Sequence, residues 1–353
     1  MSVRVIAARA GISASAVSLA LRGSPKVSSA TRETVLRIAR ELGYQPDAKV
    51  TELMARVRAT RPRRLDACFG VISLYDEPRP WEKSRHLTGI YDGMQGRAAE
   101  LGYRLEPLWL RAPGMTRRRF RSILDARGIE GLLSFGSPDP EETFPRELDH
   151  YAIVTVGMSI RTPLHRVMSH FYNDTRQALD QVHGRGYRRP GLVLAEHEAT
   201  RSGYAHASAY LGWCDQVLGP GSALPVLHMR RVEEAPLLRW IERHRADVIT
   251  VVHLYDVMAE FIATLARNGI RAPRDLGLAA VTQILDGSGL AGMQQNQHLM
   301  GAWAVELLVS RLLNQDLGIP QNPRIELVES EWHDGASLAQ RASKPPASAA
   351  HCA

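Results

Sequence analysis

The chain has 353 residues, of which 44% are apolar and 23% are charged, and its net charge is +7 at pH 7. A chain of this length builds two or three domains, and this apolar fraction fills their cores, so a largely disordered protein is excluded. No apolar run reaches the roughly 18 residues of a membrane span, and the first residues lack the apolar stretch of a secretory signal. Three widely spaced cysteines without metal-ligand spacing favour a reducing compartment. We therefore expect a cytoplasmic protein without a membrane partner.

The charge is concentrated at one end of the chain. Residues 1–64 hold 13 Lys and Arg against 4 Asp and Glu, whereas the remaining residues hold 31 against 33. A basic head on a nearly neutral body indicates that the head meets a polyanion while the body has another task. On charge alone, a basic tail that only aids solubility stays open.

Apolar residues recur at helical spacing three times within the first 45 residues. The first run ends at a turn containing Gly11, and Ser13 is placed to cap the second run. Ser28 is placed to cap the third run, which ends at Gly43. Two short helices across a tight turn, closed by a third, predict a helix-turn-helix. Its expected core is Val3, Ile6, Ala7, Ala10, Val17, Ala20, Leu21, Val35, Ile38, Ala39 and Leu42.

The second helix has another face, opposite Val17 and Leu21. Small, mostly uncharged residues and one leucine suit a helix in the major groove, because serine can hydrogen-bond base edges and leucine can touch a thymine methyl. An ordinary solvated helix of a three-helix bundle remains the alternative. The residues of this face are Ala14, Ser15, Ser18, Leu19 and Arg22.

Three segments of the head resemble the LacI (lactose-repressor) family of bacterial regulators: residues 9–18, Val27-Ser28 with Thr31-Arg32, and residues 41–46. The resemblance implies that the second helix reads operator DNA, with Ala14, Ser15 and Leu19 at the bases. It places Ser18 and Arg22 nearer the phosphates. Family members more often carry Arg or His at the position of Leu19, so we expect an apolar contact there instead of a bidentate guanine contact.

Residues 46–64 follow the head and differ from it in texture. Pro46 ends the head, residues 48–55 are good helix formers, and five arginines follow. A helix this short is marginal in water, so it would form only when docked. The segment resembles the family's hinge helix, which implies that Leu53 enters the minor groove and kinks the operator. A plain linker is the alternative.

Short apolar runs alternate with amphipathic stretches from residue 65 to residue 335, and this rhythm predicts βαβ units on parallel sheets. Two such blocks, separated near residue 160, predict two lobes. The order resembles the periplasmic-binding-protein-like core of the same family. The expected fold class is therefore α/β. The expected domains are a helix-turn-helix head (1–45), a hinge helix and linker (46–64), a two-lobed effector-binding and dimerisation core (65–335) and a disordered tail (336–353).

Ligands of such cores bind where loops leave the carboxyl ends of the strands, in the cleft between the lobes. Aromatic side chains there could stack on a ring-shaped ligand, and Asp256 could accept hydroxyl hydrogen bonds. Packing within a lobe for Trp81 and Phe135, and helix capping for Asp256, are the alternatives. The candidate effector-binding residues are Ser73, Tyr75, Trp81, Phe135, Ser137, His170, Phe171, Arg201, Tyr255, Asp256 and Thr282.

Four of these residues depart from the pattern of sugar-responsive family members. Thr282 stands in a stretch where they carry an Asp, Arg201 lies two residues before a glycine instead of three, and His170-Phe171 replaces an Asp-Asn pair. These changes argue against a simple hexose. We expect a sugar or a related metabolite.

Enzyme signatures give no catalytic residues. The glycines of Gly287–Gly292 spell a dinucleotide-binding pattern, but they lie late in the chain and outside the first βα unit that this motif needs. His197-Glu198 lacks the second histidine of a zinc-protease helix. We therefore expect no cofactor and no metal.

The leading interpretation is a regulator, most often a repressor in this family, that binds a pseudo-palindromic operator in double-stranded DNA and is controlled by a small molecule. It would act as a homodimer or tetramer at the bacterial nucleoid. The alternatives are a cytoplasmic α/β enzyme or small-molecule-binding protein with a basic N-terminal extension, and a periplasmic solute-binding protein.

Overall fold

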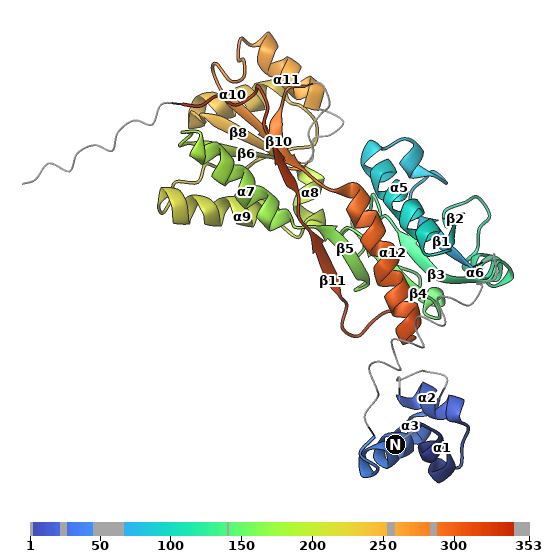
Figure 1. Cartoon of the computed structure of the whole chain (residues 1–353). Coiled ribbons are helices and arrows are strands. Elements are labelled where there is room, and N and C mark those ends of the chain that lie inside the picture. Colours follow the sequence, from blue (N-terminus) through green and yellow to red (C-terminus); the bar gives the residue numbers. More distant parts are fainter. Residues whose placement is uncertain are drawn as a thin grey trace, which may run out of the picture. The chain divides into compact units, whose positions relative to one another are not determined.

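The structure, a computed structural model, describes residues 3–21, 27–44, 67–139, 141–252, 258–282 and 288–341. The chain divides into two compact units, and each is built from separate stretches of sequence (Figure 1). Unit 1 comprises Met1–Val167 and Gln297–Ile325, and unit 2 comprises Met168–Asn296 and Glu326–Ala353. The first change of unit therefore falls at Val167, a few residues beyond the boundary expected near 160.

The head consists of three helices: α1 (Val3–Ala10), α2 (Ala14–Leu21) and α3 (Ser29–Glu41). All three contribute apolar residues to one small core, as the helical spacing predicts. This confirms the predicted helix-turn-helix. Its buried members are Ile6, Ala7, Val17, Ala20, Val35, Ile38 and Ala39, with Val3, Ala10, Ile12, Leu21, Val27, Leu42 and Tyr44 packed partly buried around them.

The sheet of unit 1 has the strand order β11-β5-β4-β3-β1-β2. Its strands are β1 (Cys68–Ser73), β2 (Arg104–Trp109), β3 (Ile129–Ser134), β4 (Ala152–Val156), β5 (His165–Ser169) and β11 (Ile325–Val328). The pairs from β2 through β5 run parallel, which confirms the predicted α/β class. Helices α5 (Arg85–Glu100) and α6 (Arg117–Ala126) and the 3-10 turns η1 (Pro80–Glu82) and η2 (Arg146–Leu148) connect the strands.

Helix α12 (Gln297–Asn314) returns late in the chain and packs beside α5 and against β3 and β4 in unit 1 (Figure 1). Two glycines let the helix backbones approach closely. A Cβ atom on Gly93 would lie 1.9 Å from the backbone oxygen of His298, and one on Gly301 would lie 2.0 Å from that of Ile90. Neither position can hold a side chain without moving backbone, so the glycines set how closely α5 and α12 pack.

The sheet of unit 2 has the order β12-β10-β9-β8-β6-β7. Its strands are β6 (Pro190–Ala195), β7 (Leu227–Met229), β8 (Val248–Val252), β9 (Gly277–Ala280), β10 (Ala291–Gln294) and β12 (Glu331–His333). The sheet is parallel except for the pair β10–β12. The described helices of this unit are α7 (Phe171–Gly184), α8 (Glu196–Arg201), α9 (Ala205–Trp213), the π-helical turn η3 (Cys214–Leu218), α10 (Glu234–His244) and α11 (Met258–Arg267).

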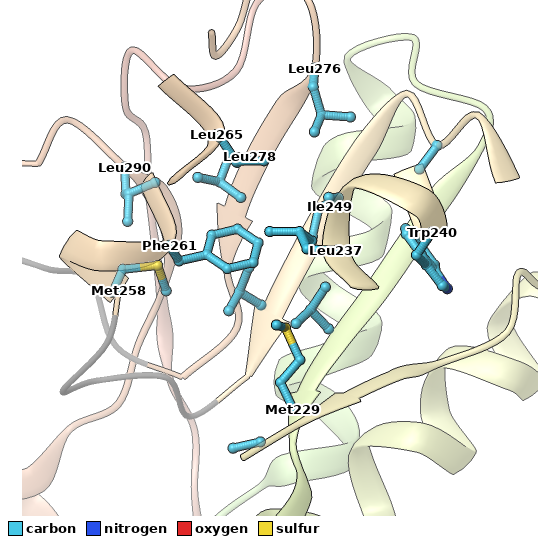
Figure 2. Packing of buried hydrophobic residues seen from close by; sticks show 14 of the residues in the cluster. Met229, Leu237, Trp240, Ile249, Met258, Phe261, Leu265, Leu276, Leu278 and Leu290 are labelled. Atoms are coloured by element: carbon cyan, nitrogen blue, oxygen red, sulfur yellow. The ribbon is translucent and has the colours of Figure 1, made fainter. Parts of the chain in front are cut away.

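One face of this sheet is covered by α10 and α11. Figure 2 shows Phe261 of α11 pointing toward Leu237 of α10 and Ile249 of β8, with Trp240 of α10 on the far side of the same cluster. Each large apolar side chain buried here contributes about 1.5–3 kcal/mol relative to an exposed one. Gly191 of β6 leaves room for the Trp240 ring, since a Cβ there would lie 2.3 Å from it.

The late glycine motif has a structural role. Gly292 belongs to strand β10 and pairs with Ala280 of β9, and a Cβ on it would lie 2.2 Å from the Ala280 oxygen. A strand follows Gly289 where a dinucleotide-binding motif would open a helix. The glycine therefore serves close strand pairing.

The expected start of the disordered tail at residue 336 needs correction. The Ser337 hydroxyl donates to the Leu278 oxygen at 2.6 Å and accepts from the Ala291 amide at 2.8 Å. Arg341 stacks over the Tyr187 ring at 4.2 Å. These contacts fix the chain on unit 2 as far as Arg341; residues 342–353 lie outside the described part.

Candidate functional site

The second helix of the head begins where its sequence predicts. Gly11 has φ +67°, a left-handed conformation that glycine adopts without strain. Ser13 then caps α2, since its hydroxyl accepts the Ala16 amide at 3.1 Å and its carbonyl accepts the Val17 amide at 3.1 Å. Ser28 caps α3 in the same way by accepting the Thr31 amide at 3.2 Å. These caps fix the direction in which α2 projects.

Helix α2 presents the expected face to solvent. Ala14 and Ser15 are exposed and Ser18 and Leu19 are half-buried, whereas Val17 on the other side is fully buried. The helix contains no charged residue. A surface of this kind can approach base edges closely, and the hydroxyl of Ser15, 2.9 Å from that of Ser13, can also hydrogen-bond a base. The structure thus brings Ala14, Ser15, Ser18 and Leu19 together. Arg22 and Leu53 lie outside the described residues.

Two arginines on the other helices of the head, one on α1 and one on α3, share a single carboxylate. Arg9 and Arg37 both reach Glu41, at 3.8 and 2.8 Å, and all three side chains are largely exposed. Exposed ion pairs of this kind contribute little stability, so the arginines can exchange their carboxylate partner for a phosphate at small cost.

In unit 1, four of the candidate effector residues come from the carboxyl ends of two neighbouring strands. Strands β1 and β3 pair in parallel register, with Ile72 opposite Ser134. Ser73 is the last residue of β1 and Tyr75 follows it, and Phe135 and Ser137 follow β3. The structure therefore gathers these four residues at one edge of the sheet, as the strand prediction requires.

The two serines at this edge are already engaged. The Ser73 hydroxyl donates to the Glu77 oxygen at 2.6 Å, and the Ser137 hydroxyl donates to the carboxylate of Glu142 at 3.1 Å. Both serines are fully buried. They shape the loops after β1 and β3, and a ligand would have to compete for their hydroxyls.

Trp81 belongs to a packed aromatic cluster of unit 1. Its ring stacks on that of Tyr91 at 4.4 Å with an interplanar angle of 7°, and Phe135 lies 5.2 Å away. Trp81 is only 5% exposed. Burial also raises the pKa of Tyr91. The alternative of lobe packing therefore describes Trp81 and Phe135 in this structure. Tyr91 escaped the sequence analysis because it lies within a helix, although its spacing from Leu87 and Ile90 was a signal that could have found it.

In unit 2, His170 and Phe171 begin helix α7. The His170 Nδ1 lies 3.2 Å from a carboxylate oxygen of Glu329, and the Phe171 ring lies 5.0 Å from that of His206. His206 is buried, with Nδ1 2.8 Å from the Thr175 hydroxyl. His206 was missed because only the fold brings α9 beside α7.

The remaining positions of unit 2 lie at other strand ends. Arg201 is half-buried at the end of α8, the helix that follows β6. Thr282 follows β9, is 1% exposed, and accepts the Gln295 amide at 3.3 Å through its carbonyl. Tyr255 and Asp256 lie outside the described residues.

Two further searches cover the described residues only. No group of three or more His, Cys, Asp or Glu side chains there is placed to hold a metal ion. No helix in that part of the chain combines the length and apolar character needed to span a bilayer.

Comparison with known proteins places both parts of the chain. Residues 3–47 match the family described as bacterial regulatory proteins, lacI family, and residues 179–338 match the periplasmic binding protein-like domain. The HTH-type transcriptional regulator CelR of Thermobifida fusca is 26% identical over 341 residues, covering 89% of this chain and 92% of CelR. The HTH-type transcriptional repressor CytR of Escherichia coli K12 is 22% identical over 330 residues, covering 90% and 91%.

Solved structures share the fold. A transcriptional regulator CelR–cellobiose complex has a TM-score of 0.60 at 21% identity, covering 96% of this chain and 99% of that one. A lac repressor dimer bound to operator and the anti-inducer ONPF has a TM-score of 0.57 at 14% identity, with the same coverage. The helix-turn-helix head and the two parallel-sheet units thus occur together, in this order, in relatives along nearly the whole chain. This chain belongs to the LacI family of bacterial regulatory proteins and is a transcriptional regulator with a DNA-binding head and an effector-binding core.

Proposed function

We propose that the protein is a repressor that binds a pseudo-palindromic operator as a homodimer. Its affinity for this operator changes when a small molecule binds the core. The observation that carries this proposal is the uncharged face of α2, which Ser13 caps, in a head with a large excess of positive charge. Such a face reads bases, while the positive charge of the head supplies affinity for phosphates. Two heads related by two-fold symmetry would read the two half-sites.

Each residue of the face has a distinct role in this proposal. Ser15 hydrogen-bonds a base edge, Ala14 allows close approach, and Leu19 contacts a thymine methyl. Ser18 and Arg22 contact the backbone, and Leu53 enters the minor groove at the centre of the operator and kinks it.

The effector proposed for the core is a sugar or a related metabolite that bears a ring. CelR has been solved with cellobiose, and the lac repressor with the anti-inducer ONPF. The polar and aromatic residues at the strand ends of unit 1 and the pair His170-Phe171 of unit 2 would contact it. Tyr255, Asp256, Arg201 and Thr282 are the further positions proposed for the effector.

Selection of duplexes from a random DNA library by the full-length protein tests the proposed readout. We expect enrichment of a pseudo-palindrome, and we expect Leu19→Ala to relax the preference at one position in each half-site. Leu36→Ala is the matched control, because Leu36 is an exposed leucine on α3 outside this face. If Leu19→Ala leaves every base preference unchanged, or if no sequence is enriched, the proposed readout is wrong.

The proposed insertion of Leu53 into the minor groove needs a separate measurement, the bend angle of the selected operator. We expect a smaller bend with Leu53→Ala than with the wild-type protein, since unstacking by the leucine side chain is lost. An unchanged bend would remove Leu53 from the proposal without affecting base reading by α2.

A further inference from the structure

A buried carboxylate lies beside the places where the chain changes unit. The chain changes unit at Val167–Met168, at Asn296–Gln297 and at Ile325–Glu326. We call residues 168–169, 295–296 and 326–330, which lie on the unit 2 side of these points, the crossing segments. Asp174, in the first turn of α7, is fully buried in unit 2.

Each crossing segment directs one polar side chain at Asp174. The Ser169 hydroxyl donates to its Oδ2 at 2.8 Å and lies 3.2 Å from the Ser330 hydroxyl, which also interacts with the carboxyl. Gln295 approaches the carboxyl from the remaining segment. All three partners are at most 6% exposed. Side chains far apart in the sequence therefore meet at one acidic group.

The hydrogen bonding of this group is incomplete. Oδ1 of Asp174 and Nε2 of Gln295 are buried, and within the described part of the chain neither completes a hydrogen bond of full strength. A buried carboxylate needs strong donors to stay charged, because water no longer solvates it. Burial raises the pKa of Asp174 to about 6, while hydrogen bonding by Ser330, Ser169 and Gln295 opposes this rise.

The other titratable groups around Asp174 are few among the described residues. The charge of Glu329, on the link between β11 and β12, raises the pKa of Asp174 further. Glu329 is itself 3.2 Å from His170 at the start of α7. From α9, His206 hydrogen-bonds Thr175. The charge of Glu329 therefore contributes to the raised pKa of Asp174.

We propose that Asp174 is the positioning residue of the core, whose carboxyl group holds the three crossing segments together on unit 2. The raised pKa of Asp174 means that the protonated carboxyl is the form that this buried arrangement favours, with the Ser169 and Ser330 hydroxyls and Gln295 around it. The charged form, whose Oδ1 lacks a donor among the described residues, weakens the arrangement. In the proposed repressor, these segments connect the units covalently, so a change in how firmly they are held would reach both units; this signalling role rests on the proposed function. The anchoring itself does not.

Hydrogen exchange of the full-length protein between pH 5 and pH 8, corrected for the intrinsic pH dependence, tests the anchor without DNA or effector. In the wild type we expect the amides of the crossing segments to lose about tenfold in protection as the pH rises through about 6, with β1 of unit 1 unchanged. Asp174→Asn should abolish the step. Asp180→Asn, on the same helix but exposed and bonded to Trp213 and Arg176, should keep it.

Glu329→Gln provides a variant at an exposed position that does not depend on tolerance of a core substitution. It should move the midpoint of the step to lower pH, because the charge that raises the Asp174 pKa is gone. A purely structural role predicts a loss of protection throughout unit 2, including β8, with no pH step. A wild-type profile without a step, a step that survives in Asp174→Asn, or a Glu329→Gln midpoint that stays or rises would each overturn the proposal.

Discussion

The head and the sheet-containing part of unit 1 each bury an apolar core, but they assemble it from very different distances along the chain. In the head, every core residue lies between Val3 and Tyr44, and α2 and α3 each have a capping serine directly before them. In unit 1, the helix beside α5 is α12, which enters about 200 residues later. The difference teaches that the DNA-reading part is encoded locally, whereas the sensing part depends on long-range contacts.

The charge distribution repeats this contrast, and it yields the prediction with the largest effect. Residues 1–64 carry most of the excess positive charge. If the dimer makes about six to ten phosphate contacts, its affinity for DNA should fall about 10³- to 10⁵-fold between 50 and 200 mM salt. Fluorescence anisotropy across a salt series measures this slope. A nearly flat curve would contradict the assignment of the head to DNA.

The local core of the head predicts that one substitution can unfold it separately. Ile6 is fully buried, and Ile6→Ala should destabilise the head by about 2–5 kcal/mol, through lost burial and a cavity. Calorimetry should show a lowered head transition beside an unchanged core transition, together with lost DNA binding. Val5→Ala is the control, because Val5 is 43% exposed and should change little. If Ile6→Ala shifts the unfolding transitions of the head and of the core equally, the head does not fold independently of the core.

The buried Asp174 predicts a pH effect on the core. Its pKa is about 6 in the folded state against the ordinary 3.8, so the folded chain binds this proton more tightly than the unfolded chain. The stabilisation is fully present below about pH 4 and is lost as the pH rises through about 6. The loss amounts to about 3 kcal/mol relative to Asp174→Asn. Denaturant unfolding of the wild type and of Asp174→Asn at pH 4.5 and pH 7.5 measures this loss. If the two proteins differ by the same free energy of unfolding at both pH values, the prediction is wrong.

The contact between α5 and α12 predicts the smallest change in stability. The sign of this change differs between two glycines of α5. Gly93→Ala forces a Cβ against the backbone of α12 and should lower core stability by about 1–3 kcal/mol or more. Gly96→Ala, on the same helix, meets only a side-chain atom at 4.0 Å and should raise stability by about 0.5–1 kcal/mol. Thermal unfolding of the two variants checks both signs. Equal effects would mean that α5 and α12 do not pack through Gly93.

The sequence predicted the head almost completely because its signals are local. Ser13, Ser28, Gly11 and Gly43 each act within four residues of the turn or helix end that they define. The apolar runs of the core coincide with β1, β3, β4, β6, β8 and β9 but not with the interior strands β5 and β10, since only buried parallel strands of continuous apolar sequence give this signal.

Edge strands and long-range partners escaped prediction for physical reasons. Strand β2 contains Arg104, Glu106 and Pro107, and it lies at the edge of its sheet, where polar residues and proline are tolerated. Strand β7 is a short edge strand of the other sheet. The partners of Asp174 are Ser169, Gln295 and Ser330, and no local sequence pattern predicts that these residues meet. The packing of Trp81 on Tyr91 likewise needs the folded loop.

The central claim is that the local head and the long-range core form one regulatory device. The measurement that tests it most directly is the affinity of the full-length protein for its selected operator, with and without a sugar or related metabolite that raises the thermal stability of the core. We predict that such a metabolite changes the affinity of the protein for its operator about 5- to 150-fold, and that bound operator changes the affinity of the protein for the metabolite by the same factor. Stabilising metabolites that all leave DNA affinity unchanged would contradict it.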